Sequence, residues 1–309
     1  MPQTIVAVAI GTAQPPTLIS SNATIPSWAR KYINGFIGAF PHTLGANSDY
    51  VIDYRQCPAD QLLPSATGPG LFTNALQADY ILCLSTTVLR AAAQAYPDTD
   101  ANSPPIIGMC SHPEKEKFKA QKNVCGVKAG RSDDAPDAYR RLLDTVVDPP
   151  LNSATVLSDN SYTPSTDGVT NIHNGGDHPT VANVSNPNDV KNWINGANAG
   201  EGVLLLPVDW MFGAATDIIG WASNRNVLDF WLVTDWVQAS SNQSAFGGYG
   251  VPQETSGEYL AQQLNSYWTG QGNPGWFHVP QNRRVWQASQ TRANSANVTL
   301  NTHGPVIIP

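Results

Sequence analysis

Short, continuously apolar segments separated by stretches of helical periodicity are the feature that most constrains the fold of this chain. Residues 78–85 (ADYILCLS) and 202–209 (GVLLLPVD) are two such segments, and a run with apolar residues at helical spacing follows each. A strand that is buried on both faces reads as a near-continuous apolar run, whereas a half-exposed strand alternates apolar and polar residues. Alternation of such strands with helices predicts parallel sheets covered on both faces, and therefore an α/β fold.

This alternation occurs twice along the 309 residues. In the first half we predict strands at residues 4–11, 49–54, 78–85, 104–111 and 123–130 and helices at 25–40, 70–77 and 86–97. In the second half we predict strands at 153–160, 202–209, 228–235 and 244–251 and helices at 135–147, 186–197, 210–223, 253–268 and 282–295. Residues 162–186 are rich in Gly, Asn, Asp and Thr and give no readable element. A chain of this length suits two lobes of about 150 residues each.

Charge and cysteine usage exclude several classes of function. Charged residues make up 13% of the chain, against about 25% in an average soluble protein. The formal net charge is -7, which argues against nucleic acid as a partner because phosphate binding needs clustered Lys and Arg. No segment approaches the roughly 18 apolar residues that a membrane helix needs. The four cysteines form no C-x-x-C pair, so we expect neither a disulfide framework nor a zinc site. Cys83, Cys110 and Cys125 lie in strand-like runs, so we expect these three to be small buried apolar side chains.

Polar and aromatic residues follow nearly every predicted strand. In open parallel sheets ligands bind beyond the carboxyl ends of the strands, and the ends of two such sheets can face one another across a cleft. The candidate ligand-binding residues at these positions are Thr12, Ser85, Thr86, Thr87, Ser111, Asp209, Trp210, Asp235 and Trp236.

Two interpretations of these residues remain open. Ser, Thr and Asp are preferred helix N-caps, so Ser85 or Thr86 can cap the helix that follows, and Asp209 can cap a helix that begins at Trp210. A Trp in a strand-end loop, such as Trp210 or Trp236, either packs under a neighbouring loop or offers a flat apolar wall to a ligand.

Several longer motifs occur together in the order of one known family. In the first half they are ADYILCLSTTVLRAAAQAYPDT, PPIIGMCSHPEKEKF and NVCGV, and in the second half GVLLLPVDWMFGAATDIIGWA, LDFWLVTDW, FGGYGVPQETSGEYLAQQL and NRRVWQASQTRANSANVTL. This order resembles the substrate-binding proteins of a group of bacterial ABC transporters whose characterised members bind aromatic amino acids such as tryptophan and tyrosine. The chain departs from that family at GTAQPPTLISSNATIPSW, which is longer and lacks its His-Pro, and at residues 163–183, which are also longer.

The resemblance implies a type I periplasmic-binding-protein fold with two lobes, each a parallel sheet flanked by helices, and a ligand cleft between them. Residues 1–129 plus 246–278 would form the N-terminal lobe, and residues 130–245 plus 279–309 the C-terminal lobe. The lobes would close on a ligand about crossing segments near Gly130, Phe246 and Val279.

The resemblance also implies roles for the candidate residues. Ser85, Thr86 and Thr87 would present hydroxyls and helix N-terminal N–H groups to a ligand carboxylate. From the other lobe, Asp209 and Asp235 would hold a ligand amine. Trp210 or Trp236 would stack on an apolar or cationic part of the ligand, and Ser111 would line the hinge side of the cleft.

Catalytic and metal chemistry have weaker support. The chain has no G-x-S-x-G elbow, Walker loop or Rossmann glycine fingerprint, and we expect no cofactor and no metal. HNGGDH (His173 to His178) brings two His and one Asp together, but no fourth ligand lies nearby in sequence. Asp209 and Asp235 could act as paired carboxylates in acid–base chemistry, but on this scaffold we expect a protein that is not an enzyme.

We therefore expect a solute-binding protein that captures a small organic ligand by lobe closure, with an ABC permease as a partner. The favoured ligand is an aromatic or other amino acid. The alternative is a self-assembling or partner-bound structural protein, and so a homo-oligomer, because the surface is poor in charge and the C-terminal THGPVIIP is apolar. Since no signal peptide is recognisable, we expect a periplasmic protein if the sequence is a mature form and a cytoplasmic one if Met1 is native.

Overall fold

The chain divides into two compact units, each with its own sheet. The computed structural model describes residues 3–10, 17–19, 25, 27–39, 50–66, 68–73, 76–110, 113–114, 116–128, 131–144, 146–206, 208–237, 243–301 and 305–308. Unit 1 comprises Met1–Ala129 and Gln253–Val279, and unit 2 comprises Gly130–Pro252 and Pro280–Pro309. The chain thus passes between the units three times.

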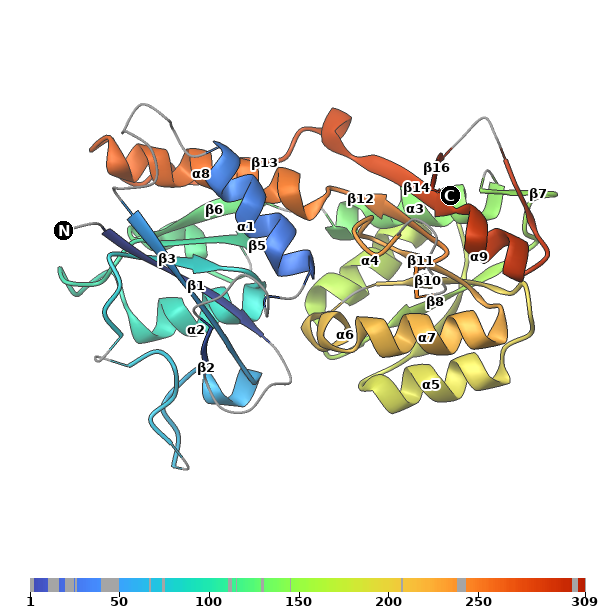
Figure 1. Cartoon of the computed structure of the whole chain (residues 1–309), viewed down its shortest axis with the longest axis horizontal. Coiled ribbons are helices and arrows are strands. Elements are labelled where there is room, and N and C mark those ends of the chain that lie inside the picture. Colours follow the sequence, from blue (N-terminus) through green and yellow to red (C-terminus); the bar gives the residue numbers. More distant parts are fainter. Residues whose placement is uncertain are drawn as a thin grey trace. The chain divides into compact units, whose positions relative to one another are not determined.

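Unit 1 is built on a sheet with the strand order β13-β6-β5-β4-β1-β3-β2 (Figure 1). Its strands are β1 (Gln3–Ile10), β2 (Thr17–Ile19), β3 (Tyr50–Cys57), β4 (Tyr80–Cys83), β5 (Ile106–Cys110), β6 (Val124–Lys128) and β13 (Trp276–His278). Neighbouring strands run parallel except β2, which is antiparallel to β3. The central strands β4 and β5 are buried almost along their whole length, as their continuously apolar sequences predict.

Helices cover both faces of the unit 1 sheet. Helix α2 (Thr86–Ala95) packs on one face, where Val88 and Leu89 meet the side chains of Val6, Val8 and Ile81. On the other face lie α1 (Ser27–Ala39) and α8 (Gln253–Trp268), which contact each other closely. The short 3₁₀ helices η3 (Ala59–Gln61) and η4 (Phe118–Ala120) complete the unit.

Two glycines bring α1 and α8 into backbone contact. A Cβ atom at Gly257 would overlap the carbonyl oxygen of Tyr32, and one at Gly35 would overlap the carbonyl oxygen of Glu254. Small residues at a helix crossing allow this close approach. The segments 25–40 and 253–268 are thus helices that pack against each other, although they are far apart in sequence.

Unit 2 is built on a second sheet, with the strand order β16-β14-β12-β11-β10-β8-β9. Its strands are β8 (Ala154–Ser158), β9 (Thr180–Asn183), β10 (Gly202–Leu205), β11 (Leu228–Trp231), β12 (Gly247–Gly250), β14 (Val285–Ser289) and β16 (Val306–Ile308). Among the described strands of this sheet, only β12 and β14 pair in antiparallel fashion. A separate two-stranded ribbon pairs β7 (Val147–Asp148) with β15 (Thr299–Leu300).

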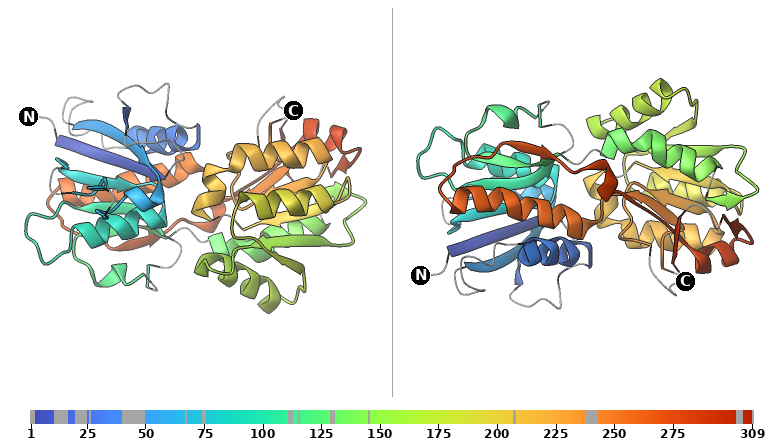
Figure 2. Two further views of the ribbon diagram at one scale, coloured as in Figure 1. Left: turned by 90° about the horizontal axis from the view of Figure 1, so that it is seen from below. Right: turned by 90° about the horizontal axis from the view of Figure 1, so that it is seen from above.

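Helices again cover both faces, and Figure 2 shows this layering in each unit. One face carries α3 (Arg131–Asp144) and α4 (Thr163–Asn174). The other carries α5 (Pro187–Gly196), α6 (Asp209–Gly213) and α7 (Ala215–Arg225). The 3₁₀ helix η5 (Gln281–Arg283) precedes β14, and helix α9 (Gln290–Ser295) follows β14. The predicted α/β fold with helix-covered parallel sheets is confirmed.

The two units share one strand order. In unit 1 the parallel core runs β3-β1-β4-β5-β6, and in unit 2 it runs β9-β8-β10-β11-β12. Numbered along the chain, both orders are 2-1-3-4-5, the flavodoxin-like order of doubly wound sheets. In such a sheet, the connections leave in opposite directions from the first and third strands, and the crevice outside their carboxyl ends is the usual ligand position. These switch points lie between β1 and β4 in unit 1 and between β8 and β10 in unit 2.

Four secondary-structure predictions need correction. Residues 282–295 are not one helix, because Val285–Ser289 forms β14 and only Gln290–Ser295 is helical. Residues 210–223 form two helices, α6 and α7, separated at Ala214. No helix forms among the described residues of 70–77, and the stretch 162–186 contains α4 and β9.

The lobe boundary expected near Phe246 lies further along the chain. Unit 2 extends to Pro252, because β12 pairs with β11 and β14 inside the second sheet. The other two crossings fall at Ala129–Gly130 and Val279–Pro280.

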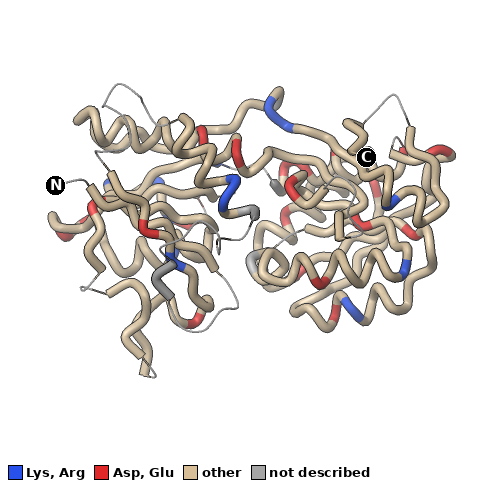
Figure 3. The backbone as a smooth tube through the Cα atoms, viewed as in Figure 1, with Lys and Arg blue, Asp and Glu red and all other residues tan. Residues whose placement is uncertain are grey.

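The remaining features agree with the composition. All four cysteines are free and buried, so the predicted burial of Cys83, Cys110 and Cys125 is confirmed. Figure 3 shows the charged residues of the described segments scattered along the chain. Among the helices of the described residues, none combines the length and apolar character that a membrane crossing needs.

Candidate functional site

The carboxyl edge of the unit 1 sheet places the Ser85–Thr87 turn beside the β1/β4 switch point. Strand β4 ends at Cys83, and Ser85 is the N-cap of α2, with its Oγ accepting a hydrogen bond from the Val88 N–H at 3.3 Å. The capping interpretation of Ser85 is therefore confirmed. A hydroxyl that accepts one bond still has its own proton to donate, so capping does not use up its capacity.

The exposure of this turn differs from residue to residue. Thr86 is buried, with 8% of its surface exposed, whereas Ser85 and Thr87 are half-buried. Helix α2 starts here, so the positive end of its dipole lies at the carboxyl edge of the sheet. Thr12 and Ser111, the other candidates from this half of the chain, lie outside the described residues.

The switch point of unit 2 is spanned by a hydrogen bond between two side chains. The indole Nε1–H of Trp210, just after β10, donates to Oδ2 of Asp159, which follows β8, at 3.0 Å. Asp159 is 5% exposed, whereas Trp210 is half-buried and rests against the apolar cluster on the α5–α7 face. Chain segments 51 residues apart in sequence are thus joined where this fold usually binds ligands.

The surroundings of Asp159 favour its ionised form. Burial raises the pKa of this carboxyl, but the Ser161 hydroxyl, the Trp210 indole and the Ser161 backbone N–H all donate hydrogen bonds to it. The donors outweigh burial, and the pKa lies below its ordinary value. The pair therefore joins a carboxylate to a neutral indole.

Small polar side chains fix the turn that carries Asp159. Ser165 Oγ accepts from the Asp159 backbone N–H at 3.0 Å and lies 3.0 Å from Ser158 Oγ. The Asn160 N–H donates to the side-chain oxygen of Asn183 at 3.0 Å. These bonds tie the end of β8 to α4 and β9, so the position of the carboxylate is defined from several sides.

Asp209 is the first residue of α6, and the N-cap is Val208, which makes no side-chain capping bond. The expectation that Asp209 caps this helix is therefore wrong, because the helix begins one residue earlier than predicted.

Asp235 and Trp236 lie in the loop after β11 and are largely buried, with 7% and 8% of their surfaces exposed. The Trp236 ring meets the edge of Trp231 at a centroid distance of 4.4 Å and lies 5.1 Å from the ring of Phe212. Trp236 therefore belongs to the apolar cluster on the α5–α7 face of unit 2. Of the two candidate tryptophans, Trp210 is the more exposed.

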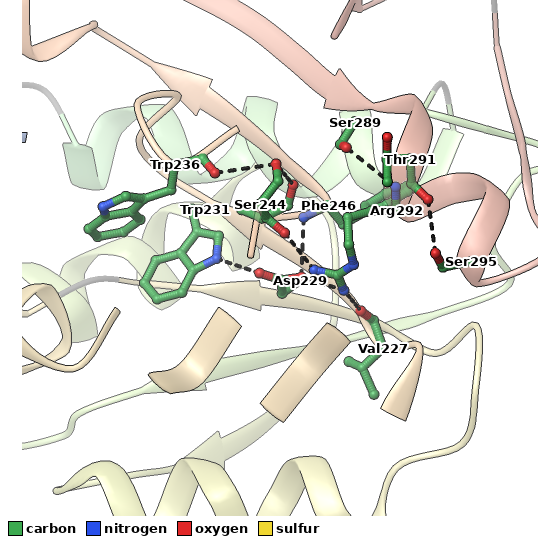
Figure 4. A network of polar contacts seen from close by, with 11 residues as sticks. Val227, Asp229, Trp231, Trp236, Ser244, Phe246, Ser289, Thr291, Arg292 and Ser295 are labelled. Carbon is green, nitrogen blue, oxygen red and sulfur yellow. Dashed lines mark hydrogen bonds and ion pairs between the residues drawn. The ribbon is translucent and has the colours of Figure 1, made fainter. Parts of the chain in front are cut away.

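A buried ion pair supports this aromatic cluster (Figure 4). Asp229 accepts from the Trp231 indole at 2.8 Å and from the Phe246 N–H at 3.2 Å, and it pairs with Arg292 at 3.0 Å. Burial raises the pKa of the Asp229 carboxyl, and Arg292 opposes that rise. Arg292 also donates to the carbonyl oxygens of Ser244 and Val227. Helix α9 is thus tied to β11 and to the segment before β12.

The HNGGDH segment forms a ring pair and an ion pair. His173 and His178 have centroids 5.8 Å apart, and Asp177 is bound to Arg140 at 2.8 Å. Within the described part of the chain, no group of three or more His, Cys, Asp or Glu could hold a metal ion.

Asp159 belongs to the site but is not among the candidate ligand-binding residues that were named from the sequence. Its sequence signal is the segment Ser158-Asp159-Asn160 directly after an apolar strand, which resembles the other strand ends. What cannot be read from sequence is the partner, because Trp210 is brought to it only by the β8–β10 pairing.

Comparison with known proteins gives the fold its name. No family model matches the sequence, and no curated protein matches it either. Among solved structures, a conserved domain protein from Vibrio cholerae is 14% identical with a TM-score of 0.68, covering 99% of this chain and 100% of that one. An ABC domain from Streptococcus pneumoniae in complex with L-Trp is 12% identical with a TM-score of 0.66, covering 97% and 96%. A ligand-free, open substrate binding protein with adhesive properties from Clostridium difficile is 12% identical with a TM-score of 0.60, covering 99% of both chains.

Structures with the same architecture also include a LacI family transcriptional regulator from Mycobacterium smegmatis. Two of these neighbours are described as a substrate binding protein and a transcriptional regulator. The shared strand order, the two units joined by three crossings and the end-to-end structural matches lead to one conclusion. The chain has the type I periplasmic-binding-protein fold.

Proposed function

We propose that the protein is a solute-binding protein that captures a small organic molecule between its two units. The observation that carries the proposal is the Trp210–Asp159 pair at the β8/β10 switch point, where sheets of this order bind ligands. Unit 1 would contribute the Ser85–Thr87 turn at its own switch point. Asp209 stays a candidate by its position after β10, at the start of α6. Asp235 and Trp236 are largely buried, so they would contribute less contact to a ligand than Trp210.

An aromatic amino acid is the ligand class that we favour. The Streptococcus pneumoniae domain holds L-Trp. An indole wall from unit 2 together with the N-terminus of α2 from unit 1 would suit a ligand with a ring and a carboxylate. A periplasmic solute binding protein from Actinobacillus succinogenes with the same fold holds D-allose, so sugars belong in the same screen. A receptor role would place the protein outside the cytoplasm with an ABC permease as its partner.

The experiment is a thermal-shift screen of amino acids and monosaccharides, followed by calorimetric titration of each compound that raises the melting temperature. A ligand at 100 times its Kd stabilises the folded state by about 2.7 kcal/mol, which the screen detects. Trp210→Ala should abolish the shift, whereas Trp221→Ala, a half-buried tryptophan on α7, should retain it. If no compound shifts the melting temperature, or if both variants lose binding equally, the proposal fails.

Self-assembly is the second candidate function, and one observation favours it. Strand β16 is one of the two edge strands of the unit 2 sheet as described, and Val306 on it is 55% exposed. An exposed apolar edge strand is a template for pairing with another chain. Light scattering separates the two proposals: a monomer that binds ligand supports the receptor, and large particles without ligand binding support assembly.

A further inference from the structure

Unit 2 contains two Asp–Trp indole pairs with different surroundings. In the first, Trp231 and Asp229 are fully buried, and Arg292 neutralises the carboxylate. In the second, Trp210 is half-buried, and the described residues place no Lys, Arg or His in an ion pair with Asp159. The first pair is therefore part of the core, whereas the second holds its charge with N–H and O–H donors alone.

The geometry of the second pair fixes the orientation of the exposed tryptophan. An ionised acceptor forms a shorter and stronger hydrogen bond than a neutral one, and Asp159 is itself held by Ser161 and by the turn after β8. Both carboxylate oxygens of Asp159 are engaged, because Oδ1 accepts from Ser161 and Oδ2 accepts from the Trp210 indole. The N–H edge of Trp210 therefore points into the protein, and the exposed part of the side chain is carbon.

We propose that Asp159 is a positioning residue for the ligand site: it holds the indole N–H of Trp210, so that Trp210 meets the ligand only through its apolar ring. This inference rests on the proposed function. Because the only polar atom of the indole is already bound, Trp210 selects ligands with a planar, aromatic or cationic group that packs on a ring, and it supplies no hydrogen bond to them. Ligand carboxylate and amine groups must then be bound by other residues.

The test that needs no ligand is the indole N–H resonance of Trp210 in protein labelled with ¹⁵N-tryptophan, assigned by its loss in Trp210→Phe. In Asp159→Asn the resonance should shift, and its exchange with water should speed up by about tenfold, since a charge-assisted bond is lost. Asp159→Glu should restore part of the protection. The Trp231 resonance is the internal control, because its own aspartate is untouched.

Binding supplies the second readout, with L-tryptophan as the probe. Asp159→Asn should weaken its binding by about tenfold, while Ser161→Ala, which removes one bond to the other carboxylate oxygen, should change it by less than about threefold. The proposal is overturned if Asp159→Asn leaves the Trp210 resonance in place, or if it disturbs the Trp231 resonance equally. If L-tryptophan does not bind the unaltered protein, the proposed ligand class fails, and the resonance of Trp210 still decides the role of Asp159.

Discussion

Replacing Arg292 with methionine should destabilise unit 2 strongly, because this arginine is the cation for a fully buried carboxylate. The Arg292 side chain is 2% exposed and that of Asp229 is 0% exposed. Removing one partner of a buried ion pair costs about 3 to 5 kcal/mol, since the other charge is left without compensation. Methionine retains most of the apolar stem, so little of the loss comes from a cavity.

Two backbone carbonyls add to that cost. Arg292 donates to Ser244 O at 2.7 Å and to Val227 O at 2.8 Å, and each lost bond is worth about 1 kcal/mol. Protonation of Asp229 reduces the loss of stability, because a neutral carboxyl needs no cation beside it. We expect a net loss of about 4 kcal/mol near neutral pH, within the range for broken buried pairs.

The assay is urea unfolding followed by circular dichroism and tryptophan fluorescence, with the unfolding of the two units fitted separately. The pKa of Asp229 is already raised by burial, and removing Arg292 raises it further. A carboxyl whose folded pKa exceeds its unfolded pKa contributes stability that is lost as pH rises through the folded value. Arg292→Met should therefore be less destabilised at pH 5 than at pH 8.

A double variant completes the test. The loss of stability in the double variant Asp229→Asn, Arg292→Met should be smaller than the sum of the losses in the two single variants. When both side chains are replaced, no charge is left buried without a partner. A loss below about 1 kcal/mol in Arg292→Met, or single-variant losses that simply add, would show that Arg292 does not compensate the charge of Asp229.

Three further predictions concern packing, charge and capping. Gly257→Ala should destabilise unit 1 by several kcal/mol, because its Cβ would overlap the Tyr32 carbonyl oxygen, whereas Gly38→Ala, with open space around it, should be neutral or slightly stabilising in the same urea titration. Burial raises the pKa of Asp134 from 3.8 to about 6 against the opposing charge of its arginine partner. Stability from this group is thus present below pH 4 and lost as pH rises through 6, and Asp134→Asn should flatten the pH dependence of the unfolding midpoint in that window. Asn186→Ala should cost about 1 kcal/mol, because the Asn186 side chain accepts two backbone N–H bonds at the start of α5; an unchanged midpoint would contradict its capping role.

The periodicity of buried strands and amphipathic helices predicts most of the fold. Strands β4 and β10 are apolar without interruption because helices cover both of their faces. The helix predicted at 253–268 has the same bounds as α8. These features depend on local sequence, so they can be read without the structure.

The secondary-structure predictions are wrong where contacts between distant segments determine the local structure. Residues 285–289 (VWQAS) have helical neighbours, but pairing with β12 and β16 makes them a strand. The stretch 162–186 carries few apolar residues, yet α4 needs only Ser165, Gly168 and Ile172 on its buried face. Neither the sheet pairing nor so narrow a buried face is visible in the composition of the segment.

The candidate site is predictable only in part. Strand ends mark Ser85 and Trp210 in the sequence, but their roles depend on burial and partners that sequence does not show. Trp236 carries the same signal as Trp210, and unit 2 nevertheless buries it against Trp231. Asp159 acquires its importance from strand order, because β8 and β10 are neighbours across the switch point.

Hydrogen–deuterium exchange with and without a ligand from the screen shows whether both units hold the ligand, because it reports on both at once. A bound ligand should slow exchange simultaneously at the start of α2 in unit 1 and in the turns after β8 and β10 in unit 2, around Asp159 and Trp210. Protection confined to one unit, or to segments away from the carboxyl edges of the two sheets, would contradict the proposed function.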